Sequence, residues 1–192
     1  MARKRTIPDD DLLTAARACF VERGISASTK EIARRAGVSE GLLFLRYGSK
    51  ADLFFAAMVP PTDGALRERL QAARQDPGDF LALGLSMLDY FRGAADVLLP
   101  LIAHPDFRFE SFAQRHPDST LSSLRREAMA YFTQVRAVDP PASALLLLSS
   151  LFGVVMFEKL GAHGGEMPPD MVRRMLDRIR AAASGAAPQA QR

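Results

Sequence analysis

The chain of 192 residues is long enough to bury a core without disulfides or metals, and its single cysteine excludes an intramolecular disulfide framework. It carries 25 lysines and arginines against 22 aspartates and glutamates, a net charge of +3. Residues 1–59 hold ten of the basic and seven of the acidic side chains, so the whole positive excess lies there. So small an excess is ordinary by itself, although it agrees with a nucleic-acid partner for that part of the chain.

The beginning of the chain is basic and then predicts a first helix. Arg3, Lys4 and Arg5 form a short arm without an apolar core, so we expect no signal peptide and a cytoplasmic protein. Thr6 is a candidate N-cap, and the acidic run Asp9–Asp11 suits the positive end of a helix dipole. The helix is expected to bury one apolar stripe, which comprises Leu12, Leu13, Ala16, Cys19 and Phe20.

Residues 28–47 have the pattern of two short helices joined by a three-residue turn. Ser28 and Glu31 form a capping box that predicts the start of the first helix. Gly37 suits the left-handed conformation that ends it, and Ser39 is placed to cap the second helix. This is the plan of a helix-turn-helix, which places its second helix in the major groove of DNA. A generic helical hairpin in a small bundle is the alternative.

The second helix of this pair is expected to bury Leu43 and Tyr47, which are four residues apart. Its outward residues are then Leu42, Phe44, Leu45 and Arg46. Gly48 and Ser49 predict another helix stop and cap, followed by a helix over residues 50–59. A pair of prolines comes next and marks the end of this region.

From Leu12 to Met58 the sequence resembles the TetR family of bacterial transcriptional regulators. The resemblance rests on the phenylalanine and Glu-Arg-Gly that close the first helix, on the Ile-Ala…Ala-Gly-Val-Ser turn, and on the Ser-Lys that opens the fourth helix. It implies a DNA-binding regulator, a homodimer on a near-palindromic operator, a small hydrophobic effector, and repression as the family's default output. The expected domains are a DNA-binding domain (1–59) and a ligand-binding and dimerisation domain (60–185), before a disordered tail (186–192).

Three residues of the second motif helix depart from what members of the family often carry. Leu42 stands at a position where a small hydroxyl residue is frequent, Phe44 where tyrosine is, and Leu45 where a polar residue is. Leucine cannot donate a hydrogen bond, but it can contact a thymine methyl group. Specificity is therefore expected to rest on Arg46, on Ser39 and on operator shape. The alternative is that these apolar residues are partly packed and the helix reads DNA weakly.

The full set of residues expected to contact DNA extends over the arm and the motif. It consists of Arg3, Lys4, Arg5, Ser28, Thr29, Lys30, Ser39, Glu40, Gly41, Leu42, Phe44, Leu45, Arg46 and Lys50. Lys50 begins a helix, where its ammonium group and a backbone N–H could hold a phosphate.

The rest of the chain predicts helices throughout, because the period-two alternation typical of strands is absent. We expect helices over 65–75, 79–93, 108–115, 119–135, 140–160 and 170–183, with a short separate apolar segment at 97–102. Together with the N-terminal helices this makes an all-α protein of about nine helices. The longest apolar stretch, 142–157, contains small residues and is interpreted as too short to span a bilayer comfortably, so no membrane partner is expected.

The last two predicted helices are expected to form the homodimer interface. The helix over 140–160 is apolar nearly all round, so it should be buried on more than one side, and its small residues would let a partner approach. The interface is predicted to contain Leu146, Ser150, Gly153, Phe157, Val172, Met175, Leu176 and Ile179. A helix that is simply central to a monomer is the alternative.

Aromatic and methionine side chains gather in the middle helices, and such a cluster is more often core than pocket. The resemblance to TetR regulators raises the expectation that some of them line a cavity for a small hydrophobic molecule. The candidates are Met87, Tyr90, Phe91, Phe109, Phe112, Met129, Phe132, Phe152 and Met156. Tyr90, Gln134, Arg136 or His104 could supply a polar contact, and the sequence does not rank them.

Catalysis is the class of function with the least support. The three histidines, His104, His116 and His163, lack metal-ligand spacing, so we expect no metal, cofactor or catalytic residue. The sequence contains no GxSxG, and Gly48-Ser49-Lys50 lacks the spacing of a P-loop. A helical adaptor that binds another protein through the apolar terminal helices is a further alternative. A salt-dependent gel shift with palindromic DNA distinguishes it from a regulator.

Overall fold

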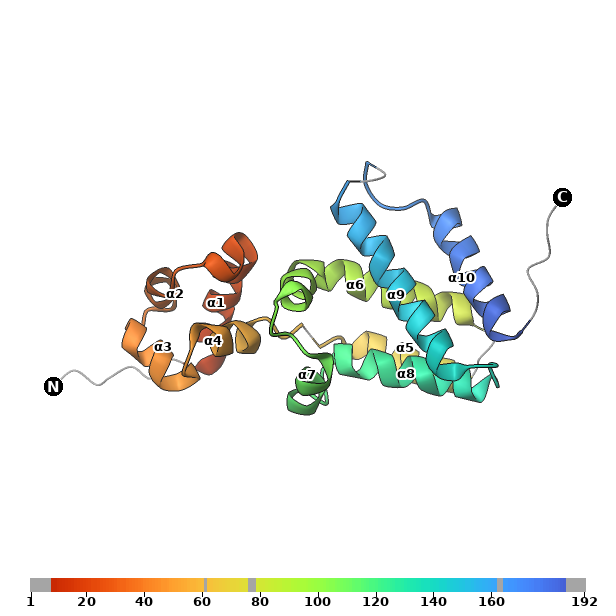
Figure 1. Cartoon of the computed structure of the whole chain (residues 1–192), viewed down its shortest axis with the longest axis horizontal. Helices are drawn as coiled ribbons and strands as arrows, with labels where there is room; N and C mark the ends of the chain where they lie inside the picture. Colours follow the sequence, from red (N-terminus) through yellow and green to blue (C-terminus); the bar gives the residue numbers. More distant parts are fainter. Residues whose placement is uncertain (1–7, 61, 76–78, 162–163, 186–192) are drawn as a thin grey trace. The chain divides into compact units, whose positions relative to one another are not determined.

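The computed structural model describes residues 8–60, 62–75, 79–161 and 164–185. Within these ranges it contains ten α-helices, one short 3-10 helix and no strand, so the predicted all-α fold class is confirmed. The predicted basic arm, the Thr6 cap and the C-terminal tail lie outside the described residues. Figure 1 shows the helices, which in chain order are α1 (Asp9–Arg23), η1 (Gly24–Ser26), α2 (Thr29–Ala36), α3 (Glu40–Tyr47), α4 (Lys50–Ala57), α5 (Gly64–Gln75), α6 (Phe80–Ala103), α7 (Phe109–Arg115), α8 (Thr120–Gln134), α9 (Pro140–Lys159) and α10 (Pro169–Ala183).

The chain divides into two compact units, each made of two segments. The first unit comprises Met1–Pro60 and Asp96–Arg108, and the second comprises Pro61–Ala95 and Phe109–Arg192. The sequence assigned only residues 1–59 to the first domain. The end of α6 and the turn after it are therefore an addition to that unit which no local signal indicated.

Helix α6 is longer than the sequence predicted. It was expected to end near Gly93, but it continues as one helix through Pro100. A proline inside a helix removes a backbone hydrogen bond and clashes with the preceding turn, at a cost of about 3 kcal/mol. Leu98 and Leu101 flank it and are fully buried, and such burial is worth about 1.5–3 kcal/mol for each side chain. The burial of these leucines therefore outweighs the tendency of Pro100 to end the helix.

In the first unit, α1 packs on α2 and α4. Phe20 and Phe54 are buried and meet edge to face, with ring centroids 5.1 Å apart. Arg17 closes the end of α4, since its guanidinium donates to the Ala57 carbonyl at 2.7 Å and to the Val59 carbonyl at 3.1 Å. These carbonyls lie where a helix lacks internal donors. Arg17 therefore ties the end of α4 back to α1.

In the second unit, α8 packs along α9, and α9 also contacts α10. A largely buried ion pair fastens α6 to α9, because Arg92 donates to both carboxylate oxygens of Glu158 at 2.7 and 3.1 Å. The Met167 N–H donates to the same carboxylate at 2.8 Å. The hydrogen bond from Arg92 is the main reason that the pKa of Glu158 lies below its ordinary value.

Helices α6 and α10 cross closely at a glycine. A Cβ atom added to Gly84 would lie 2.6 Å from Cδ2 and 2.8 Å from Cδ1 of Leu176, which is fully buried. Because a fully buried leucine has no free space into which to turn, the crossing requires a residue without a side chain in α6.

Replacing Gly84 by alanine should therefore destabilise the protein. The overpacking cost of about 1–3 kcal/mol exceeds the gain in helix propensity of up to about 1 kcal/mol. Gly93 is the matched control, because it lies in the same helix with no atom within 4 Å of an added Cβ, and alanine there should be neutral or stabilising. Urea denaturation of both variants measures the difference, and equal changes in the free energy of unfolding would contradict the close crossing.

Candidate DNA-binding surface

The turn between α2 and α3 is fixed by a backbone cap and a side-chain cap. Gly37 adopts the left-handed conformation, with φ 68° and ψ 29°, and its N–H donates to carbonyls of the last turn of α2. Ser39 accepts a hydrogen bond from the Leu42 N–H at 3.3 Å, as the predicted cap requires. Ile32 of α2 and Leu43 of α3 are buried. The predicted helix-turn-helix is present.

The predicted capping box at the start of α2 is wrong. Ser28 occupies the N-cap position in an extended conformation, but its side chain makes no cap hydrogen bond. The Glu31 carboxylate instead accepts from Arg34 at 2.7 and 2.9 Å and from Arg35 at 2.9 Å. Charge-assisted bonds from guanidinium groups are stronger than a bond from a neutral backbone N–H, so the arginines replace the box.

Arg35 also joins α2 to α1. Its two terminal nitrogens donate to the two carboxylate oxygens of Glu22, each at 2.7 Å. Hydrogen bonds from Arg34 and then Arg35 lower the pKa of Glu31 to about 2, and the hydrogen bond from Arg35 also lowers the pKa of Glu22. These two arginines are thus engaged within the unit, so they attract phosphates less than a count of charges suggests.

The outward face of α3 is apolar. Leu45 is 82% exposed and Phe44 is 43% exposed, whereas Leu42 is half-buried. On the inward side Leu43 is buried, and Tyr47 is only half-buried. The surface offered by this helix is therefore formed mainly by two large side chains that cannot donate hydrogen bonds.

Both charged residues of α3 have partners on other helices. Glu40 accepts a hydrogen bond from the Thr29 hydroxyl at the start of α2. Arg46 Nη1 lies 2.8 Å from Asp9 Oδ1, in the first turn of α1, and the Tyr47 hydroxyl donates to the same oxygen at 3.5 Å. The sequence indicated Asp9 only as a favourable charge at a helix end. Nothing in its spacing pointed to a partner 37 residues away.

The remaining predicted DNA contacts that the structure describes lie at or next to helix N-termini. Helix N-termini present free N–H groups and a partial positive charge, which suit phosphate. The residues are Ser28, Thr29 and Lys30 at α2, Ser39, Glu40 and Gly41 at α3, and Lys50 at α4. Arg3, Lys4 and Arg5 lie outside the described residues.

Comparison with known sequences agrees with this geometry. Residues 12–57 match the profile of the tetR family of bacterial regulatory proteins. The chain carries a TetR-family helix-turn-helix domain. The match covers α1 to α4, so it includes both the motif and the two helices that hold it. A search of curated proteins found no match.

Solved structures of TetR type resemble nearly the whole chain. FadR from Bacillus subtilis, crystallised with stearoyl-CoA, aligns with a TM-score of 0.66 at 11% identity over 91% of this chain and 99% of that one. A TetR-like regulator from Rhodococcus sp. RHA1 aligns at 0.55 and 21% identity, over 95% and 96%. NalD from Pseudomonas aeruginosa, the secondary repressor of the MexAB-OprM efflux pump, aligns at 0.58 and 22% identity, over 90% and 94%. At these identities the likeness establishes a shared TetR-regulator fold.

Outside the TetR-type motif domain, α9 exposes an apolar face. Leu145 is 69% exposed, Leu146 44%, Phe157 53% and Leu160 73%. Leu146 and Phe157 were predicted interface residues, and the other two were missed. Ser150 and Gly153, also predicted, are half-buried on the same helix. Leu146, Ser150, Gly153 and Phe157 recur every three or four residues, so they share one stripe of α9. Leu160 follows just after the end of the helix, and Leu145 lies on another side, where it lines a groove with residues of α8.

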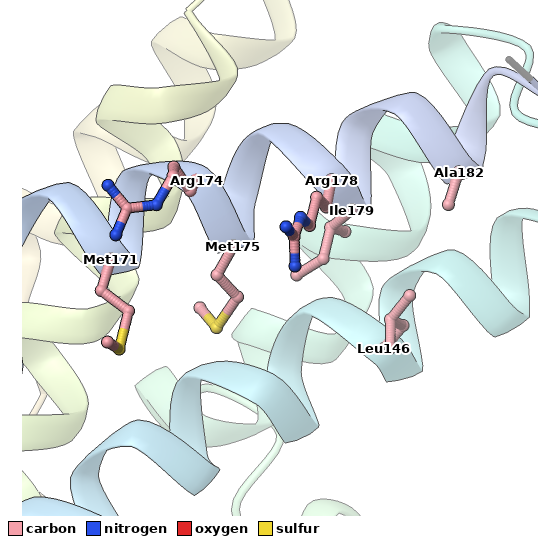
Figure 2. A pocket seen from close by; sticks show the side chains of 7 residues that line it. All are labelled: Leu146, Met171, Arg174, Met175, Arg178, Ile179 and Ala182. Atoms are coloured by element: carbon pink, nitrogen blue, oxygen red, sulfur yellow. The ribbon is translucent and has the colours of Figure 1, made fainter. Parts of the chain in front are cut away.

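On α10 most of the predicted interface residues face the second unit's own core. Val172, Leu176 and Ile179 are at most 4% exposed, so the apolar stripe that suggested an interface is the inner stripe of this helix. Met175 is half-buried. Figure 2 shows it on α10 between Met171 and Arg178, where it lines a groove of about 410 Å³ to which α9 contributes Leu146. The groove is lined by Leu146, Met171, Arg174, Met175, Arg178, Ile179 and Ala182.

The predicted ligand-pocket residues are mostly core. Met87, Tyr90, Phe91, Phe112 and Phe132 are buried, and Phe109, Met129, Phe152 and Met156 are half-buried. Met129 lines a groove of about 460 Å³ between α8 and α9, together with Arg125, Asp139, Pro141, Ala142, Ala144, Leu145 and Leu148. Tyr90 is buried, and this burial is the main reason that the pKa of its phenol lies above the ordinary value.

Two further expectations concern membranes and metals. Helix α9 has 20 residues and is, among the described residues, the one helix long and apolar enough to cross a membrane. The interpretation of this stretch as too short was therefore wrong on length, although α9 packs on α8 and α10 as a core helix does.

The described part of the chain contains no group of three or more His, Cys, Asp or Glu side chains that could hold a metal ion. His163 lies outside that part.

The cluster around Glu31 has a measurable signature. Because its pKa is lowered to about 2, the ionised carboxylate favours the folded state above the ordinary pKa of a glutamate, and this contribution is lost as pH falls towards 2. A carboxyl-detected NMR titration should find Glu31 titrating near 2. In an Arg34→Ala variant its pKa should rise towards the ordinary value. An unaltered titration in that variant would contradict the cluster.

Proposed function

We propose that this protein is a cytoplasmic transcriptional repressor that binds a near-palindromic operator as a homodimer and is released by a small hydrophobic effector. The observation that carries the proposal is the exposed outward face of α3, with Leu45 82% and Phe44 43% exposed, in a domain that matches the tetR family. The exposed parts of these two side chains add nothing to the core of the unit, and they lie next to each other on the helix that a helix-turn-helix presents to DNA. A major groove provides apolar surface for them in the methyl groups of thymine.

Orientation on DNA would come from phosphate contacts rather than from base contacts. Ser28, Thr29 and Lys30 at α2 and Lys50 at α4 lie where helix N-termini offer N–H groups. Ser39 and Gly41 at the start of α3, with Glu40 held by Thr29, allow the backbone to approach closely. Base readout would then rest on Leu42, Phe44 and Leu45 and on the shape of the operator.

Support for a homodimer comes from the apolar stripe of α9. On this stripe Leu146 is 44% and Phe157 53% exposed, and exposed apolar surface of this kind marks interaction sites. Gly153 lies on α9 with no atom of its own chain within 4 Å of an added Cβ, so internal packing does not require a glycine there. A two-fold pair of chains would present two α3 helices to half-sites one or more helical turns apart.

Support for an effector comes from the fold relatives and from the groove beside Met129. FadR was crystallised with stearoyl-CoA, so the TetR-regulator fold accommodates a long acyl chain in one of its members. NalD, described as a repressor, supports repression as the output. An effector that prefers one spacing of the two α3 helices would shift operator affinity by its difference in binding free energy between the two states.

The readout proposal is tested by Leu45→Ser. Loss of one apolar base contact should weaken binding to an operator selected from random duplexes by about 1–3 kcal/mol, roughly five- to 150-fold, without changing affinity for mixed-sequence DNA. Ile25→Ser is the control, because Ile25 is a 44% exposed apolar residue of the same unit outside α3. Fluorescence anisotropy measures both. An equal loss on both kinds of DNA would make Leu45 irrelevant to specificity.

The dimer proposal is tested by Gly153→Arg. An added Cβ meets nothing within 4 Å, so the arginine can leave the helix towards solvent and the fold should survive while a partner is excluded. Gly93→Arg is the matched control, since Gly93 is another mid-helix glycine with nothing within 4 Å of an added Cβ. Light scattering should find a dimer for the wild type and Gly93→Arg and a monomer for Gly153→Arg. A monomeric wild type, or a Gly153→Arg variant that remains a dimer, would contradict the proposed interface. A folded dimer that binds no palindromic DNA would favour an adaptor.

A further inference from the structure

The ion pair between Asp9 and Arg46 connects the first turn of α1 to the last turn of α3. Arg46 Nη1 lies 2.8 Å from Asp9 Oδ1. The arginine side chain is 22% exposed, whereas the aspartate is 68% exposed. The guanidinium is therefore held against the domain by a carboxylate that itself remains at the surface.

This pair determines the charge of the surface that α3 offers. Arg46 is the only basic residue of α3, whose sequence is EGLLFLRY. Its positive charge is matched by the carboxylate of Asp9, while Phe44 and Leu45 remain exposed beside it. Non-specific affinity for DNA comes almost entirely from lysines and arginines that neutralise phosphates. An arginine bound to a carboxylate contributes less to that term than one that can turn to the backbone of DNA.

We propose that Asp9 is a specificity-determining residue, which holds Arg46 away from phosphates so that recognition depends on the apolar contacts of Phe44 and Leu45. The inference rests on the proposed DNA-binding function. Because non-specific binding depends almost entirely on phosphate contacts, whereas operator binding also gains from Phe44 and Leu45, Asp9 lowers affinity for mixed-sequence DNA more than affinity for the operator. It thereby raises the ratio of specific to non-specific binding, which decides occupancy of an operator among competing sites. Since an exposed ion pair contributes little to folding, the pair can be removed without unfolding the domain.

The test compares Asp9→Asn with Asp10→Asn. Both remove one negative charge from the first turn of α1, and Asp9 is the one whose carboxylate lies 2.8 Å from Arg46 Nη1. Asp9→Asn should tighten binding to a fluorescein-labelled mixed-sequence duplex by about three- to fivefold at low salt. It should also steepen the slope of log affinity against log salt by about 0.9, the value for one further phosphate contact. Asp10→Asn should leave the slope unchanged, and thermal melting should find both variants equally folded.

Two further variants assign the effect to Arg46. The double variant Asp9→Asn/Arg46→Ala should lose the gain and return to the slope of the wild type, and Asp9→Glu should retain wild-type affinity because it keeps the carboxylate. Equal behaviour of Asp9→Asn and Asp10→Asn, or a gain that survives Arg46→Ala, would overturn the inference while the wild type still binds DNA. A folded wild type that binds neither the mixed-sequence duplex nor a selected operator would overturn the proposed function itself.

Discussion

The eight residues of α3 are too few to form a stable helix alone, so the DNA-binding surface depends on how this helix is anchored to its own unit. Leu43 supplies the anchor, and burying such a side chain is worth about 1.5–3 kcal/mol. The Ser39 cap adds about 1 kcal/mol. With Leu43 turned inward, the period of the helix directs Phe44 and Leu45 towards solvent. The same burial that holds the helix therefore decides which residues it exposes.

Charge in the first unit is arranged by ion pairs within and between helices. Arg35 joins α1 to α2 through Glu22, Arg34 pairs with Glu31, and Arg46 joins α3 to α1 through Asp9. Each pair is exposed or partly exposed, so its contribution to stability is small. Under the proposed function their common effect is on DNA binding, because arginines tied to carboxylates have less attraction for phosphate. The exposed Lys30 and the helix N-termini would then carry more of the contacts to the DNA backbone.

In the second unit α9 has two apolar sides, one buried within the unit and one exposed. Leu147, Leu151 and Val155 turn the inner side of α9 into the unit's core, against α8 and α10. Leu146 and Phe157 form an outer side that the described chain leaves exposed. The inner side contributes to the stability of the folded unit, whereas the exposed outer side does not. This exposed side is the physical basis of the proposed homodimer.

Local signals in the sequence were sufficient for the helix-turn-helix, because Gly37 and Ser39 specify a turn through their own conformation and hydrogen bonding. They were also sufficient for the all-α class and for the outward position of Leu45, which follow from periodicity. Tertiary structure alone decided the continuation of α6 through Pro100, the inner placement of Leu176 over Gly84, and the partners of Glu31 and Arg46. Each of these depends on which distant side chain lies within a few ångströms, and spacing along a chain does not determine that distance.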